Sequence, residues 1–181
     1  MKLKWLSLLA MLFCTPALSY PSPLTCTRNF YVEPGGSDVN GCGTGHGTAA
    51  CATLQGADAN ITGLKGGDCV NFAAGTYNMP GGGTLTKSGT ANQANGYIRY
   101  IGTANHASKI VISSPGFFGL NVTNNYVSIE GFEWDGVNQQ GYHGYSPSNT
   151  NTYNAQYGLL INNVFGPTSS HHHWFLNNVV H

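Results

Sequence analysis

YVSIEGFEW, residues 126–134, is the stretch that decides the fold. Apolar and polar residues alternate from Val127 to Glu130, which is the period of a β-strand with one face in a core. Gly131 interrupts the alternation, and residues 132–134 follow as a second short strand. A coiling chain needs such a corner, in which a residue that accepts left-handed backbone angles joins two strands. The stretch therefore predicts a repeat that turns sharply at Gly131.

A similar pattern recurs in HHWFLNNVV, residues 172–180. The alignment places Phe175 on Ile129, Asn177 on Gly131, Asn178 on Phe132 and Val180 on Trp134. The separation of 46 residues fits either two turns of about 23 residues or one turn with a long excursion. Residues 136–156 are polar and punctuated by Gly and Pro, as surface loops are, and this favours one turn.

The rest of the chain from Cys69 onward also consists of short strand-like stretches between turn residues. These stretches are CVNFAAG, GTLTKSG, YIRYIG, KIVISS, GLNVTN and YGLLINN. Sandwiches and barrels share such alternation, but the repeated corner favours a solenoid in which each turn stacks on the last. The sequence thus predicts an all-β domain.

Residues 53–64 are the one stretch with helical periodicity. Its apolar residues recur at helical spacing, and they are Leu54, Ala57, Ile61 and Leu64. Thr53 is suited to the N-cap, and Gly66 and Gly67 are expected to end the helix. We expect this helix to cover the first turn of the solenoid, whose apolar end needs a cap.

The N-terminus has the features of a secretory signal peptide, expected to span residues 1–19. Two lysines precede an apolar run over residues 5–13, and small residues precede Tyr20. The run is too short to span a bilayer. We therefore expect a protein that is released from the cell and has no membrane partner.

The charge of the chain argues against nucleic-acid binding. The sequence has seven basic and seven acidic residues, and Lys2 and Lys4 leave with the signal peptide, so five basic residues remain. Binding to nucleic acid requires a cluster of basic residues. The length of 181 residues fits one domain.

Four cysteines remain after residue 19, and an even number in a secreted chain indicates disulfides. Cys42 and Cys51 bracket the Gly-rich loop GCGTGHGTAAC and are expected to pair. Cys26 and Cys69 then pair by elimination. A zinc site is the alternative, although the spacings contain no CxxC pair.

Two sequons, NIT at Asn60 and NVT at Asn121, are candidate sites of N-glycosylation. Their use depends on a eukaryotic source. A chain rich in Asn and Thr also contains such triplets by chance.

Several stretches together resemble the N-terminal part of secreted right-handed parallel β-helix proteins of the pectin-lyase-like superfamily. They are FYVEPGGSDVNGCGTG, CATLQGADA, GGDCVNFAAGTY, NYVSIEGFEW and HWFLNNVV. The resemblance covers residues 29–181 and implies a β-helix domain over 20–181, with an N-terminal cap over 20–68 and turns over 69–181. Members usually run well beyond this length, so we expect a truncated product, a gene-model fragment, or a chain that pairs its open end with another.

The resemblance implies cleavage of acidic polysaccharide, by β-elimination or by hydrolysis between paired acids. Elimination needs a base, and Lys109 and Arg99 are the basic residues on clear strands in the middle of the chain. Either is a candidate base or a ligand for a glycan carboxylate. The alternative is that both are ordinary surface cations.

The corner EGFEWD carries the best acidic cluster, made of Glu130, Glu133 and Asp135. Carboxylates at such spacing are candidate calcium ligands, because calcium prefers oxygen donors. The alternative is a solvated corner whose carboxylates point outward. Paired glutamates would also be needed for hydrolysis, but their spacing does not establish it.

Aromatic and histidine residues supply the remaining candidates. Tyr142 and Tyr145, together with Tyr153, are candidates for stacking on sugar rings, or else pack within their loop. His171 and His173 share a strand face and are candidate metal ligands, with His143 and His181 further away. The alternative for these histidines is an ordinary strand and turn.

These observations predict a secreted pectate-lyase-like protein that binds or cleaves acidic cell-wall polysaccharide, with calcium as a candidate cofactor. The alternative is a non-catalytic glycan-binding or surface β-helix protein, or an inactive fragment of a longer enzyme.

Overall fold

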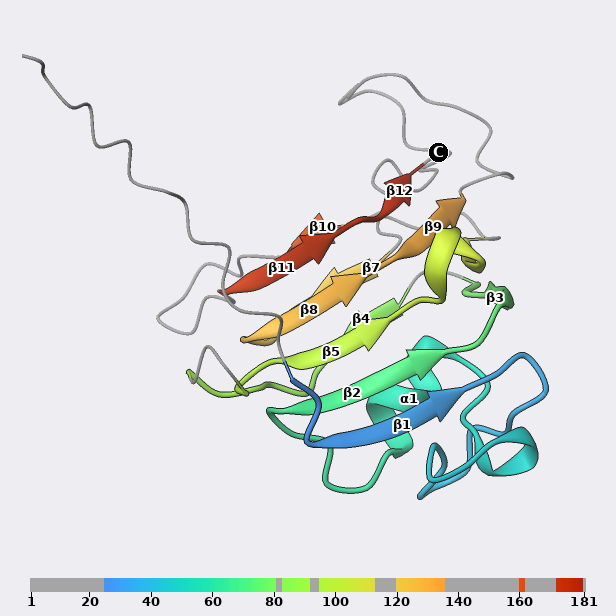
Figure 1. The fold of residues 1–181 in the computed structure, drawn as a ribbon, viewed down its shortest axis with the longest axis horizontal. Coiled ribbons are helices and arrows are strands. Elements are labelled where there is room, and N and C mark those ends of the chain that lie inside the picture. Colours follow the sequence, from blue (N-terminus) through green and yellow to red (C-terminus); the bar gives the residue numbers. More distant parts are fainter. Residues whose placement is uncertain are drawn as a thin grey trace, which may run out of the picture.

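The computed structural model describes residues 25–80, 83–91, 95–112, 120–135, 160–161 and 172–180. Residues 1–24 and 136–159 are the longest stretches outside this part. Within it, strands predominate and lie one above another (Figure 1). No helix in the described ranges is long and apolar enough to cross a membrane.

The strands form three parallel sheets. The five-stranded sheet has the order β1 (Arg28–Val32), β2 (Asp68–Phe72), β5 (Ile98–Ile101), β8 (Val127–Glu130) and β11 (His173–Leu176). The four-stranded sheet has the order β12 (Val179–Val180), β9 (Phe132–Asp135), β6 (Ser108–Val111) and β3 (Gly75–Asn78). The three-stranded sheet has the order β10 (Leu160–Ile161), β7 (Leu120–Val122) and β4 (Gly83–Leu85).

Successive strands enter these sheets in a constant rotation. From β2 onward the chain visits the five-, the four- and the three-stranded sheet in turn, and then returns to the first. Every strand pairing is parallel. The prediction of a mainly β fold with little helix is therefore confirmed.

The register confirms the alignment of the two corners. Phe175 pairs with Ile129, and Val180 pairs with Trp134. Gly131 has φ 73° and Asn177 has φ 51°, so both corners use the left-handed region. Because β11 pairs directly with β8, the chain returns to the neighbouring position of the same sheet after 46 residues.

The helical segments are short. They are η1 (Gly47–Ala49), α1 (Leu54–Asn60) and η2 (Ala104–His106). Thr53 caps α1 as predicted, because its side chain accepts a 2.9 Å hydrogen bond from the Gly56 N–H. The helix ends earlier than expected, since Ile61 already has extended angles of φ −65° and ψ 114°. Ile61 and Leu64 are nevertheless buried.

The stretch CVNFAAG, residues 69–75, was expected to be one strand, but β2 ends at Phe72 and β3 begins at Gly75. Gly75 lies at the break with φ 147°. A Cβ on Gly75 would lie 2.5 Å from the Pro34 side chain. This corner therefore requires glycine for two reasons.

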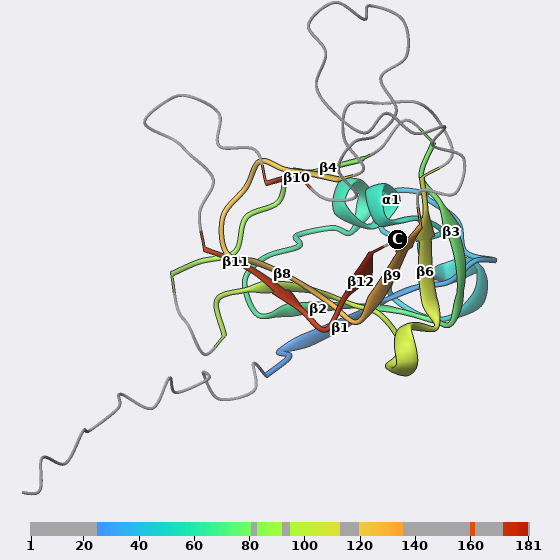
Figure 2. The ribbon, with the colours of Figure 1, turned by 90° about the horizontal axis from the view of Figure 1, so that it is seen from above.

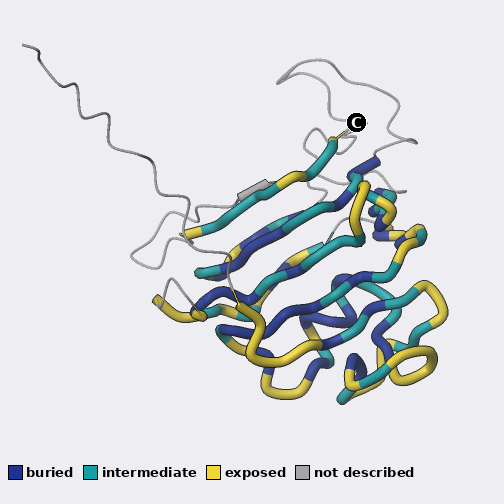
Figure 3. Tube along the Cα trace, viewed as in Figure 1, coloured by how far each residue is buried: buried dark blue, intermediate teal, exposed yellow. Residues whose placement is uncertain are grey.

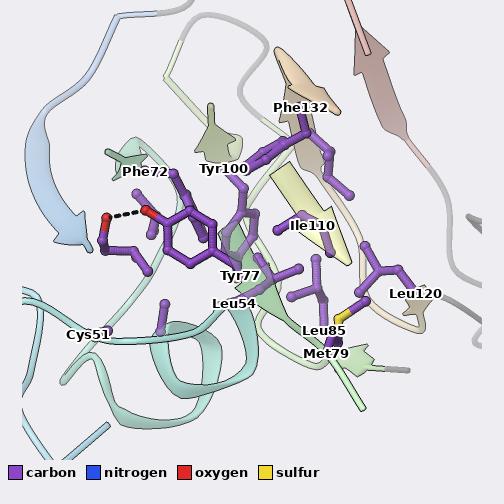
Figure 4. Close-up of a cluster of buried hydrophobic side chains, with 14 of the residues drawn as sticks. Cys51, Leu54, Phe72, Tyr77, Met79, Leu85, Tyr100, Ile110, Leu120 and Phe132 are labelled. Carbon is purple, nitrogen blue, oxygen red and sulfur yellow. Dashed lines mark hydrogen bonds between the residues drawn. The ribbon is translucent and has the colours of Figure 1, made fainter. Parts of the chain in front are cut away.

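One hydrophobic core joins all three sheets to α1. Seen from above, the sheets lie on three sides of it, and α1 lies near its β4 side (Figure 2). Residues of β5 and β6 alternate between buried and partly exposed, which gives these strands an inner and an outer face. Figure 3 shows where buried and exposed residues lie along the described chain. Figure 4 shows the labelled side chains of the sheets and of α1 pointing toward one another.

Substitutions at Gly131 should separate the corner's backbone requirement from its side-chain requirement. Gly131→Asn should cost little, because Asn177 occupies the matching position and asparagine tolerates positive φ. Gly131→Val should lower the free energy of unfolding by about 2 kcal/mol, because branched residues resist this conformation. Urea denaturation of both variants measures the difference. Equal losses would show that lost space, rather than φ, limits the corner.

Candidate functional site

The outer face of the five-stranded sheet carries an ion pair between Arg99 and Glu130, to which Ser128 adds a hydrogen bond. In register, Arg99 on β5 lies beside Ser128 on β8, two positions before Glu130. Arg99 Nε and Nη2 donate to the two oxygens of Glu130 at 2.8 and 2.6 Å. Ser128 Oγ donates to the same carboxylate at 2.7 Å. Both charged side chains are about 15% exposed, which makes this a partly buried bidentate pair.

The outer face of the four-stranded sheet carries a second charged group. Lys109 Nζ lies 3.1 Å from Glu133 Oε1 and also contacts the carboxylate of Asp135. Hydrogen bonds that Lys109 donates to Asp135, and then to Glu133, raise the pKa of Lys109 above its usual value. The amine is therefore held in its protonated form at neutral pH.

These contacts bear directly on the candidate bases. A general base must accept a proton, and Lys109 is held protonated. The guanidinium of Arg99 is occupied on two of its nitrogens by Glu130. In this arrangement both residues act as partners of carboxylates rather than as bases.

The three candidate calcium ligands do not come together. Glu130 is bound to Arg99, whereas Glu133 and Asp135 are bound to Lys109. Among the described residues, the only group of three with metal-ligand spacing is Asp38, Cys42 and Cys51, and its cysteines form a disulfide. The carboxylates of the EGFEWD corner thus do not fit a shared calcium ion.

A groove of about 200 Å³ lies beside the Arg99–Glu130 pair, where β5, β8 and β11 end. Its lining residues are Ile101, Gly102, Thr103, Ala104, Glu130, Gly131, Leu176 and Asn177. The backbones approach closely at this corner, since a Cβ on Gly102 would lie 2.6 Å from the Gly131 carbonyl oxygen. The groove combines two apolar side chains with a carboxylate and backbone polar groups.

Aromatic rings gather where the strands of the five-stranded sheet begin. The Tyr126 and His172 rings stack with centroids 4.8 Å apart, and the Tyr97 ring meets those of Tyr126 and Trp174 edge-on. His173 points the other way, and its Nε2 lies 2.6 Å from the Asn124 carbonyl oxygen. His172 precedes β11 and has φ 59°, so the alternation of strand side chains does not apply to it.

Other candidates lie outside the described residues. They are Tyr142, Tyr145, Tyr153, His143, His171 and His181. Their proposed roles in sugar stacking or metal binding stay predictions.

Both disulfides have the predicted pairing. Cys42 is bonded to Cys51, and Cys26 is bonded to Cys69. The first bond closes the Gly-rich loop, and the second ties the segment before β1 to β2.

The two sequons are partly buried in the fold. The Asn60 side chain donates to the Asp38 carbonyl oxygen at 3.3 Å at the end of α1. Asn121 lies on the central strand of the three-stranded sheet, and its Oδ1 is buried with no partner among the described residues. Glycosylation at these positions stays a prediction.

Two buried carboxylates were not foreseen from the sequence. Asp58 on α1 is 2% exposed and accepts from Thr86 N–H, Thr86 Oγ1, Lys87 N–H and Tyr100 OH at 2.7–3.2 Å. Asp68 is fully buried and accepts from the Arg28 guanidinium and from the Lys65 N–H. Their only sequence signal is that each adjoins an apolar position.

Buried phenols predict a loss of stability at alkaline pH. Burial, and then the charge of Asp58, raises the pKa of Tyr100 well above its usual value, and burial raises the pKa of Tyr77. Above about pH 10 the unfolded chain releases these protons while the folded chain retains them, so the free energy of unfolding falls as pH rises. The raised pKa of Lys109 acts with the same sign.

Denaturation series below and above pH 10 should therefore show falling stability, and Tyr100→Phe should make the fall less steep. A rise in tyrosinate absorbance while the circular dichroism stays native would contradict the protection of these phenols.

The described part of the chain thus has three candidate functional features. They are the groove, the ion pairs of Arg99 and Lys109 with carboxylates, and the aromatic group around Tyr126. No protein-family model matches the sequence, and searches of curated proteins and of solved structures give no match either.

Proposed function

We propose that the protein is a secreted right-handed parallel β-helix that binds acidic cell-wall polysaccharide along its outer surface. The constant rotation of strands among three parallel sheets supports the β-helix, because a coiling chain produces this order. The two disulfides and the signal-like N-terminus support an extracellular location.

The observation that carries the binding function is the groove. Glu130 lines it, and Arg99 is bound to Glu130. A sugar ring has C–H groups on its faces and hydroxyls at its edge. Ile101 and Leu176 offer apolar contact to the faces, while Glu130 and the backbone offer hydrogen-bond partners to the edge. Arg99 does not line the groove, but its pairing with Glu130 reduces the negative charge that this carboxylate presents to a uronate.

Binding without cleavage is favoured over β-elimination at this site. Lys109 is held protonated between Glu133 and Asp135, and Arg99 is clasped by Glu130. Neither is poised to remove a proton from a sugar carbon. The same carboxylates are not arranged to share a calcium ion that would neutralise a uronate.

The test is co-sedimentation and calorimetric titration of the full chain with polygalacturonate, alongside a neutral glucan. Ala104→Trp fills the groove and should weaken binding by about ten-fold or more. Ala107→Trp is the matched control, since Ala107 is also exposed in the same segment but does not line the groove. Equal affinities of the two variants would place binding elsewhere.

Unsaturated uronate product is measured in the same mixtures, with and without calcium. We expect none. Product that disappears in Lys109→Met or Arg99→Gln would overturn binding without cleavage and restore the lyase assignment.

A further inference from the structure

The two disulfides lie in opposite electrostatic surroundings. Cys26 is exposed, whereas its partner Cys69 is fully buried. Arg99 Nη1 lies 3.9 Å from the Cys26 sulfur and 4.0 Å from the Cys69 sulfur. A cation therefore stands against both sulfurs of this bond.

The Cys42–Cys51 bond differs in both respects. Its cysteines are 3% and 0% exposed. A carboxylate oxygen of Asp38 lies within 4.8 Å of both sulfurs. An incoming thiolate cannot reach this bond, and a thiolate formed there would face a negative charge.

We propose that the Cys26–Cys69 disulfide is a thiol-exchange site that accepts small extracellular thiols. The thiolate attacks the sulfur of Cys26, the exposed residue of the pair, and forms a mixed disulfide with it. The bond to Cys69 breaks, and the Cys69 sulfur leaves with the electron pair. A second thiol then attacks the mixed disulfide, so that two thiols are oxidised to one disulfide as Cys26 and Cys69 are reduced.

Arg99 promotes the step by stabilising the leaving thiolate. Burial of Cys69 opposes formation of a negative charge, and a guanidinium at 4.0 Å offsets this penalty. Glu130 binds the other side of the same guanidinium and so weakens its field at the sulfurs. The rate of exchange thus depends on both members of the ion pair, in opposite directions.

The fold around the site does not depend on this bond alone. The strand after Cys26, β1, is paired with β2 over five residues, from Arg28 with Asp68 to Val32 with Phe72. The Arg28 guanidinium also binds the buried Asp68 carboxylate. Exchange at Cys26 should therefore modify the native protein rather than unfold it. The inference does not rest on polysaccharide binding.

The test incubates the full chain with reduced glutathione, followed by acid quench, alkylation and peptide mass mapping over time. Glutathione should appear on Cys26, and the alkylating label on Cys69. The Cys42–Cys51 bond, measured in the same samples, should react more slowly by about ten-fold or more. The circular dichroism should stay native during the first exchange.

Two charge variants separate the role of Arg99 from general loosening of the fold. Arg99→Gln should slow exchange at Cys26 on the order of five- to ten-fold, because the leaving thiolate loses its counter-charge. Glu130→Gln should accelerate exchange, because the guanidinium is then less compensated. Arg99→Lys should restore part of the rate lost in Arg99→Gln.

Three results would overturn the proposal. One is equal rates for the two disulfides in the unchanged protein, and another is glutathione on Cys69 instead of Cys26. The third is acceleration in both Arg99→Gln and Glu130→Gln, which would mean that breaking the ion pair merely loosens the structure. If Arg99→Gln does not fold, Glu130→Gln and the comparison between disulfides still decide the matter.

Discussion

Asp58→Ala is expected to lower the free energy of unfolding by about 3–5 kcal/mol. The carboxylate is 2% exposed and accepts four hydrogen bonds. Its removal leaves the buried Tyr100 hydroxyl without an acceptor, and the Thr86 and Lys87 N–H groups, which belong to an exposed and a partly buried residue, lose theirs. A buried donor without a partner costs about 1–3 kcal/mol, and the loss of the other bonds to the carboxylate adds to this. Chemical denaturation followed by circular dichroism measures the loss.

Asp38 provides a matched control for this change. It accepts from the Ala52 and Thr53 N–H groups and from Thr53 Oγ1, but it is exposed. Water can replace its hydrogen bonds, so Asp38→Ala should cost only about 1 kcal/mol. Tyr100→Phe removes one of the four bonds to Asp58 and should cost a similar amount. If both aspartate variants lose the same free energy, burial is not the reason that Asp58 matters.

Trp134→Ala is expected to cost about 3–5 kcal/mol as well, because it opens a cavity in the core. The Trp134 side chain is 1% exposed, and its column on the four-stranded sheet also contains Tyr77, Ile110 and Val180. The centroid of its ring lies 5.8 Å from the centroid of the Phe132 ring. Urea denaturation measures the loss, and Trp134→Phe should recover part of it.

Trp174 is the control of the same residue type. It lies on the outer face of β11, beside Ser128, and is only partly buried. Trp174→Ala should therefore cost about 1 kcal/mol or less. A loss at Trp174 that equals the loss at Trp134 would contradict the assignment of inner and outer faces.

The corners and the faces of the strands could be predicted from the sequence because both depend on local rules. Alternation assigns each residue to a face, and Gly131 and Asn177 tolerate the angles that a corner requires. The capping face of α1 follows in the same way from helical spacing. The pairing of Cys42 with Cys51 followed from a short loop that only nearby cysteines can close.

The partners of the charged residues could not be predicted, because they depend on how many residues separate paired strands, and this number differs from one pair to the next. Ile98 pairs with Val127 after 29 residues, whereas Val127 pairs with His173 after 46. Without these lengths, Arg99 can be assigned to an outer face, but Glu130 cannot be identified as its partner. Asp58 was missed for a different reason, since a carboxylate in a short helix is ordinarily exposed.

The number of residues between paired strands varies, and this bears on how such a chain can change during evolution. The strands of the five-stranded sheet pair in the same way whether 29 or 46 residues separate them. Whole surface segments can therefore be gained or lost between strands while the layers keep their order. Relatives of this protein should keep one short pattern even when little other sequence identity remains. In this pattern a Gly or Asn at the corner is followed three residues later by an inward aromatic or aliphatic residue, as Gly131 is followed by Trp134.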